Sequence, residues 1–165
     1  MTTPVLVIDT SYLLELFQIP GHSNPKRSKT IKARFAQAIK LGSPLFVPLP
    51  VVFELAKHIA GVRDGAVRTR LAALLLDSVA SSIREASPWI LIPAEDPLPD
   101  LLALCTSFKE SYASQRVSLT DVCIVEEAKR LRRKYPSSTH RVHIWTTDEA
   151  LKAHEPDPDL TRLPA

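Results

Sequence analysis

Short apolar runs alternate with segments of helical periodicity along this chain of 165 residues, and this alternation limits its possible folds more than any other feature. The runs are rich in Val, Ile and Leu, which is typical of strands buried on both faces of a parallel sheet. They lie at residues 4–8, 45–47, 89–93 and 142–145. The sequence therefore predicts an α/β domain with a central, mainly parallel sheet of four or five strands and right-handed crossovers.

Capping residues and helix breakers place the helices between these runs. Asp9 and the two residues after it supply N-cap chemistry for a helix that ends before Pro20. Ser118 and Asp121 open another helix, which Pro136 stops. Further helices are expected at residues 26–41, 50–61, 62–85 and 101–112, with a Pro-rich connection at 95–100.

Length and composition are those of a single globular domain. Hydrophobic residues make up 45% of the chain and charged residues 24%, which are ordinary values. We expect one domain over residues 1–154 and a Pro-rich tail over 155–165 that is poorly ordered or bound to the surface. Cys105 and Cys123 have no CxxC spacing or neighbouring His ligand, so we expect buried thiols.

The sequence also carries expectations about location. No apolar run approaches the roughly 18 residues that a membrane-spanning helix needs. The first residues lack the basic and apolar regions of a signal peptide. We therefore expect a cytoplasmic protein with no membrane partner.

Four acidic residues fall where ligands bind in α/β folds. Asp9 and Asp148 directly follow the first and fourth predicted strands, and parallel strands gather their carboxyl ends at one edge of the sheet. Asp121 shares a helix face with apolar residues, and Glu54 lies at the edge of an apolar stripe. Acids that point inward together need a cation to offset their repulsion. The pattern predicts an acidic cluster that binds cations.

Each acid also has an ordinary structural explanation. Asp9, Asp121 and Asp148 each suit the start of a helix, where a carboxylate is favourable. Asp121 with Ser118 fits a capping box. Glu54 fits a solvated residue that is paired within its own helix. Only the joint occurrence of the four acids favours a functional site.

Four segments in this order resemble the acidic motifs of PIN domains: VLVIDTSYLLEL, PVVFEL, SLTDVCIVEEA and IWTTD. The resemblance spans residues 5 to about 150 and is closest to the small VapC-type toxin nucleases of bacteria and archaea. It implies a three-layer α/β/α fold and a metal-dependent ribonuclease. Its catalytic, metal-holding acids would be Asp9, Glu54, Asp121 and Asp148, with Mg²⁺ or Mn²⁺ as the ion suited to their oxygens.

The resemblance implies further roles and partners. Ser11 and Thr146 match the small polar positions beside the first and last acids, where they would act as hydrogen-bonding supports. A VapC-type toxin would form a homodimer and would be blocked by a separate antitoxin chain. The stretch 62–117 is longer than in the compact toxins, which puts the physiological role in question more than the chemistry.

Two basic clusters are candidates for RNA contact. The first consists of Lys26, Arg27, Lys29, Lys32 and Arg34, with no acid between them. The second occupies five of the six positions 129–134. Clustered cations are the electrostatic signature of a nucleic-acid path, although cations at a helix C-terminus are also favoured by the helix dipole.

Three alternatives remain open. A phosphotransfer domain also has an Asp after its first strand, but a receiver needs an acidic pair there and a haloacid-dehalogenase-like phosphatase needs a second Asp where this chain has Ser11. A catalytically silent PIN-like module would bind RNA or protein through its basic surface. A nuclease of structured DNA would need the same metal chemistry, because that chemistry does not require the 2′-hydroxyl.

Overall fold

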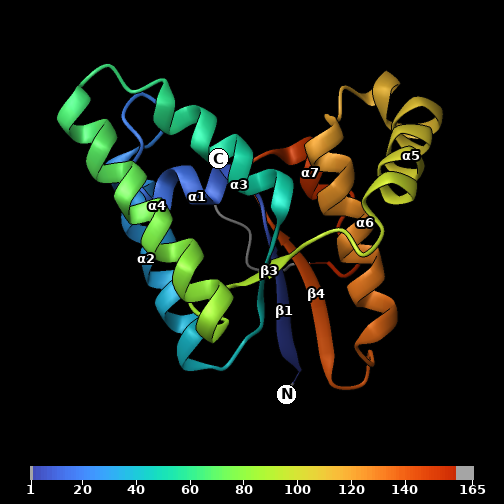
Figure 1. Cartoon of the computed structure of the whole chain (residues 1–165). Helices are drawn as coiled ribbons and strands as arrows, with labels where there is room; N and C mark the ends of the chain where they lie inside the picture. The colour runs from blue at the N-terminus through green and yellow to red at the C-terminus, as the bar shows by residue number, and fades with distance from the viewer. Residues whose placement is uncertain (1, 159–165) are drawn as a thin grey trace.

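A computed structural model describes residues 2–158 and places the predicted strands in one sheet (Figure 1). Within this part of the chain four parallel strands pair in the order β3-β2-β1-β4. They are β1 (Thr3–Ile8), β2 (Leu45–Pro48), β3 (Ile90–Ile92) and β4 (His140–Trp145). Thr3 pairs with His140 and Ile8 pairs with Trp145, so the carboxyl ends of β1 and β4 are level. The residues after Ile8 and after Trp145 therefore meet at one edge of the sheet.

Helices cover both faces of this sheet, with α1, α2 and α4 on one side and α5 and α6 on the other (Figure 1). The helices are α1 (Thr10–Leu16), α2 (Pro25–Lys40), α3 (Leu49–Ala60), α4 (Gly65–Glu85), α5 (Pro97–Ser107), the π-helix η1 (Phe108–Tyr112), the 3₁₀ helix η2 (Ala113–Gln115), α6 (Leu119–Lys134) and α7 (Glu149–Lys152). The α/β prediction is confirmed, and the arrangement agrees with the three layers that the resemblance implied. None of the described helices is both long and apolar enough to cross a lipid bilayer.

The core lies between the sheet and these two helical layers. Val5 and Val7 of β1 and Val142 and Ile144 of β4 are fully buried. The apolar face of α6 that the periodicity predicted is also fully buried: Ile124, Val125, Ala128 and Leu131. Strands covered on both faces need a continuous apolar sequence rather than an alternating one, which explains the runs.

The region from 95 to 112 differs from the prediction. The Pro-rich stretch expected as a connection begins α5 at Pro97, because proline suits the first turn of a helix. None of the α5 residues is buried, so Cys105 is exposed rather than buried. Cys123 in α6 is half-buried, and burial followed by the charge of Glu127 raises the pKa of its thiol to about 11.

The first residues of the predicted tail lie against the outer edge of β4. Asp157 Oδ2 accepts hydrogen bonds from the Val142 N–H at 2.8 Å and from Arg132 at 2.7 Å. Glu155 Oε2 accepts from the Ile144 N–H at 3.1 Å. The two carboxylates thus satisfy alternate N–H groups of an edge strand, which would otherwise be open to pairing with another chain. The tail from residue 159 lies outside the described residues.

Candidate acidic active site

Asp9 joins the end of β1 to the start of α1 and is only 6% exposed. Its Oδ1 accepts the Thr10 N–H at 2.6 Å, as expected of an N-cap. Its Oδ2 accepts the hydroxyls of Ser11 at 2.6 Å and Thr146 at 2.8 Å, together with the Ser11 N–H at 3.3 Å. Oδ2 is saturated, whereas Oδ1 keeps a lone pair for a further ligand.

The two hydroxyls also join the loops that follow β1 and β4. Ser11 Oγ accepts the Thr147 N–H at 2.9 Å, and Thr146 Oγ1 accepts the Asp148 N–H at 2.9 Å. Each hydroxyl therefore donates its single proton to Asp9 and accepts an N–H from the loop after β4. These contacts agree with the supporting positions implied for Ser11 and Thr146, whose part in catalysis stays a prediction.

The surroundings of Asp9 disfavour the negative charge of its carboxylate. Burial raises the pKa of its carboxyl, the hydrogen bonds from Ser11 and Thr146 oppose this rise, and the negative charge of Asp121 adds to it. No Lys, Arg or His in residues 2–158 forms an ion pair with Asp9. The ionised form is therefore held by hydroxyl and amide dipoles without a protein counter-charge, in a place where a bound cation would lower its free energy.

Glu54 reaches the same region through a residue that the sequence analysis did not single out. Thr10 is buried beside Asp9 and donates its hydroxyl to Glu54 Oε2 at 3.1 Å. This bond connects the start of α1 to α3. A polar residue after Asp9 was visible in the sequence, but helix capping explained it there, so only the fold reveals the link.

Asp121 and Asp148 turn toward their own helices. Asp121 is half-buried rather than fully inward, and its Oδ2 accepts from the Ser118 N–H at 2.9 Å and the Ser118 hydroxyl at 2.7 Å in a capping box. Asp148 is exposed, and its Oδ1 accepts from the N–H of Ala150 at 2.8 Å. In the part of the chain that the structure describes, no three His, Cys, Asp or Glu side chains lie close enough together to hold a metal. Without a shared cation, repulsion favours such separate local bonds.

The donor set nevertheless suits a hard divalent cation. The second carboxylate oxygens of Glu54, Asp121 and Asp148 accept no hydrogen bond from the described residues. Like Asp9 Oδ1, these are carboxylate oxygens, the kind of ligand that Mg²⁺ and Mn²⁺ prefer. Bringing them onto one ion would require side-chain rotations, because the described acids do not lie close enough together to hold a metal.

The first basic cluster lies along α2. Its four members before Arg34 are exposed, and Arg34 is half-buried with its guanidinium donating to the Tyr12 hydroxyl at 3.1 Å. Arg27 also forms an ion pair at 3.5 Å with Glu15, which is 2% exposed. Glu15 further accepts from Ser28 at 2.7 Å, so this buried acid fixes the start of α2.

The second basic cluster, on α6, is largely engaged within the protein. Lys129 pairs with Glu126 at 2.9 Å and Arg130 with Glu127 at 2.6 Å. Arg132 pairs at 2.7 Å with Asp157, part of residues 155–157, which we call the strap because they lie along the outer edge of β4. These pairs favour the structural explanation for most of this cluster over RNA contact.

Two histidines beside Glu54 also escaped the sequence analysis as a pair. His22 follows α1 and His58 lies in α3, and their ring centroids are 4.4 Å apart in an edge-on contact. Burial and then the neighbouring His22 lower the pKa of His58, while Glu54 raises it. Their separation of 36 positions leaves no local signal in the sequence.

Replacing Thr146 with Val tests how Asp9 is held. The change removes the donor to Asp9 Oδ2 and the acceptor of the Asp148 N–H, so the pKa of Asp9 should rise further and stability should fall by about 1–3 kcal/mol. Affinity for Mn²⁺ should fall about 10–100-fold, the usual effect of losing a partner of a metal ligand. Isothermal titration calorimetry measures this, and Thr146→Ser, which keeps the hydroxyl, should bind nearly as the wild type does. Equal weakening in both variants would assign Thr146 a packing role instead.

In comparisons with known proteins, the chain matches no protein-family model and no curated protein.

Proposed function

We propose that this chain is a metal-dependent ribonuclease that hydrolyses RNA phosphodiester bonds at the cluster of Asp9, Glu54, Asp121 and Asp148. The observation that carries the proposal is the buried carboxylate of Asp9. It lies at the carboxyl edge of a parallel sheet with one oxygen saturated by hydroxyls, the other open to a ligand, and Asp121 as the charge that acts on it. A structural cap alone would need neither the burial nor the bonds from the loop after β4.

In the proposed reaction each residue has a separate task. Asp9, Glu54, Asp121 and Asp148 would supply the oxygens that hold Mg²⁺ or Mn²⁺. A bound divalent ion would supply an activated water and charge stabilisation at the scissile phosphate. Ser11 and Thr146 oppose the rise in the pKa of Asp9 and fix the orientation of its carboxylate, while Thr10 orients Glu54. No side-chain nucleophile is required.

The substrate assignment rests on charge and on the resemblance to PIN domains. The exposed cations of α2, led by Lys26, Lys29 and Lys32, offer an electrostatic path for a polyanion. RNA is proposed over DNA because of the VapC-type motifs. On the same ground we propose a toxin that acts as a homodimer and is inhibited by a separate antitoxin chain.

A second function has an observation of its own. Asp121 and Asp148 bond to the first turns of their own helices, as residues with a purely structural role would. This favours a catalytically silent module of the same fold, which would bind RNA through α2 without cutting it.

Cleavage assays separate the two functions. Structured RNA and DNA of matched sequence are incubated with the protein and Mn²⁺, with EDTA as the metal-free control. We expect cleavage of RNA that EDTA stops, that Asp121→Asn abolishes, and that Asp77→Asn, a neutralised surface acid of α4, leaves unchanged. RNA binding without cleavage under all these conditions would favour the silent module, and equal cleavage by all variants would indicate a contaminating nuclease.

A further inference from the structure

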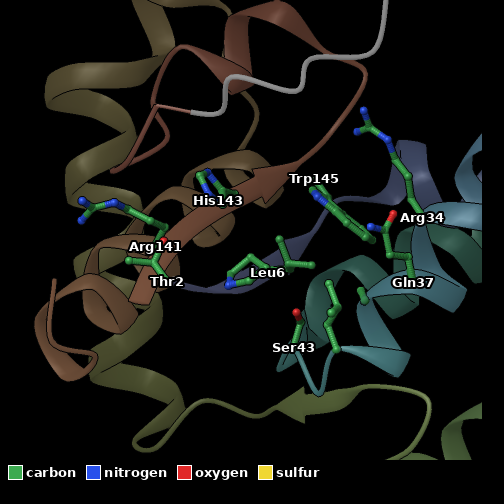
Figure 2. Close-up of a pocket in the computed structure, with 11 residues that line it drawn as sticks. Thr2, Leu6, Arg34, Gln37, Ser43, Arg141, His143 and Trp145 are labelled. Atoms are coloured by element: carbon green, nitrogen blue, oxygen red, sulfur yellow. The ribbon is translucent and has the colours of Figure 1, made fainter. Parts of the chain in front are cut away.

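A pocket of about 410 Å³ lies apart from the acidic cluster, on the face of the sheet that α2 covers (Figure 2). Its walls are the side chains of β1 and β4 that face α2, the C-terminal half of α2 and the turn after it. It follows β4 from Arg141 to Trp145, a length of about 13 Å at the usual strand rise. The volume falls within the range of roughly 300–1,000 Å³ that is usual for small-molecule sites.

The pocket carries positive charge. Figure 2 shows Arg141 and Arg34 at opposite ends of it, with Leu6 and Ser43 between them. None of the described residues that line it is acidic. The exposed Arg141 donates to the Ser137 carbonyl at 2.9 Å, and Arg34 donates to the Tyr12 hydroxyl at 3.1 Å, so hydrogen bonds hold both guanidinium groups in place. Negative charge on a ligand would therefore favour its binding in this pocket.

The middle of the pocket holds a buried hydroxyl that has no partner among the described residues. Ser43 is 6% exposed, and its Oγ makes no hydrogen bond. Gly42, with φ +66°, lets the chain reverse after α2, and the Ser43 N–H bonds to the Ala38 carbonyl at 2.9 Å. This turn holds the hydroxyl toward Leu6, as Figure 2 shows. A buried polar atom left unpaired is costly, so a ligand or ordered water that bonded to it would be stabilised.

The far wall is apolar and rigid. The indole of Trp145 lies 5.3 Å from the ring of Tyr12 and 5.3 Å from the ring of Phe35. Leu6 continues this surface. An inorganic anion would leave these apolar walls unused, and an apolar ligand would make no use of the positive charge of Arg34 and Arg141. The chemistry suits a ligand with a charged group at one end and a flat, weakly polar body.

We propose that this pocket binds one nucleotide unit, with its phosphate at an arginine, a sugar or base oxygen or nitrogen on Ser43 Oγ, and its base against Trp145 and Leu6. The choice of a nucleotide rests on the proposed ribonuclease function. Trp145 is followed directly by Thr146, which bonds to Asp9, and Arg34 belongs to the basic cluster of α2. The pocket therefore continues the proposed RNA path away from the acidic cluster, and its ligand is either a nucleotide of the bound strand or a free nucleoside monophosphate.

Binding measured in EDTA tests the pocket without the metal site. Calorimetric titrations of the full chain compare uridine monophosphate, uridine, inorganic phosphate and a four-nucleotide RNA. Arg141→Ala should weaken binding of the phosphate-bearing nucleotide about tenfold or more, as expected for a lost charge-assisted bond. Arg70→Ala, an exposed arginine of α4, is the matched control and should bind as the wild type does.

The Ser43→Ala variant gives a readout that a structural role would not produce. It removes a buried hydroxyl without a partner, so the ligand-free protein should melt about 2–4 °C higher. The increase in melting temperature caused by the ligand should become smaller than in the wild type. A structural serine would lower the melting temperature when replaced and would leave the ligand effect unchanged.

The outcomes separate the possible sources of the ligand. Binding of the monophosphate that Arg141→Ala weakens supports a free nucleotide, and binding of the four-nucleotide RNA alone with the same sensitivity supports a strand. The proposal is overturned if neither binds, if Arg141→Ala binds as the wild type does, or if phosphate or uridine binds as well as the monophosphate. If the protein binds the nucleotide but cuts no RNA with Mn²⁺, the pocket proposal stands and the nuclease proposal fails. If it cuts RNA but binds no nucleotide in EDTA, the nuclease proposal stands and the pocket proposal fails.

Discussion

Asp9→Asn should abolish RNA cleavage and the stabilisation that divalent cations give to this protein. The loss of cleavage should be about 1,000-fold or more, since a catalytic metal supplies several kcal/mol to the transition state. In the wild type, Mn²⁺ at about 100 times its Kd should add about 2.7 kcal/mol of stability. For a chain of this size that corresponds to a melting temperature about 5–10 °C higher, measured by circular dichroism.

The pH dependence of Asp9 gives an independent check in EDTA. The pKa of Asp9 is raised in the folded state, so the folded protein holds the proton more tightly than the unfolded chain does. Asp9 should therefore lower the unfolding free energy as pH rises from its ordinary value of 3.8 through the raised folded value. Asp9→Asn should lack this loss. Asp77→Asn is the control, and a cation effect that persists in Asp9→Asn would place the metal elsewhere.

Asp157→Ala should destabilise the protein by about 2–4 kcal/mol, because it removes two hydrogen bonds to a carboxylate. The Val142 N–H at the edge of β4 and the guanidinium of Arg132 would lose their partner. The melting temperature should fall by about 5–15 °C. Asp157→Asn keeps an acceptor for the Val142 N–H but not the charge, so its effect should be intermediate. An unchanged melting temperature for Asp157→Ala would mean that the strap contributes nothing.

Low pH should remove from the wild type the stability that the carboxylates of Glu155 and Asp157 contribute. Burial alone would raise the pKa of Glu155 and of Asp157. The nearby His143 and the hydrogen bond from Lys152 lower the pKa of Glu155 below its ordinary value of 4.5, and the hydrogen bonds from Val142 and Arg132 lower the pKa of Asp157 below its ordinary value of 3.8. Their stabilisation is therefore complete above those values and is lost as pH falls through the lower folded values. The stability difference between the wild type and Asp157→Ala should be constant at neutral pH and shrink below about pH 4 in urea unfolding at several pH values.

Local patterns in the sequence predicted the strands and most of the helices of this fold. The continuous apolar run ending at Ile8 indicated a strand buried on both faces, and Ser118 with Asp121 indicated the capping box that starts α6. Such features depend on residues within one turn or one strand. The predicted start of α5 was wrong because proline suits both a loop and a first helical turn, and the local pattern does not decide between them.

For the candidate site, the sequence predicted which residues belong to it but not which of them contact one another. The sequence placed Asp9 and Asp148 after strands, but it did not reveal that Thr10 bonds to Glu54 or that His22 meets His58. It also pointed Asp121 inward, whereas the capping bond to Ser118 holds it partly exposed. The position of a residue on a helix predicts only roughly where its side chain points. It does not predict which of two nearby groups the side chain will hydrogen-bond.

The sequence by itself determined the fold class, the order of the elements and the acids at their ends, because these follow from hydrophobic periodicity and capping among near neighbours. Only the tertiary structure decided which distant groups touch. The bonds of Ser11 and Thr146 to Asp9, the strap on β4 and the pocket around Ser43 all depend on the pairing of Ile8 with Trp145. A shift of one residue in that register would turn every side chain of β4 to the opposite face of the sheet, so these contacts are set by the pairing of β1 with β4 and not by any local pattern.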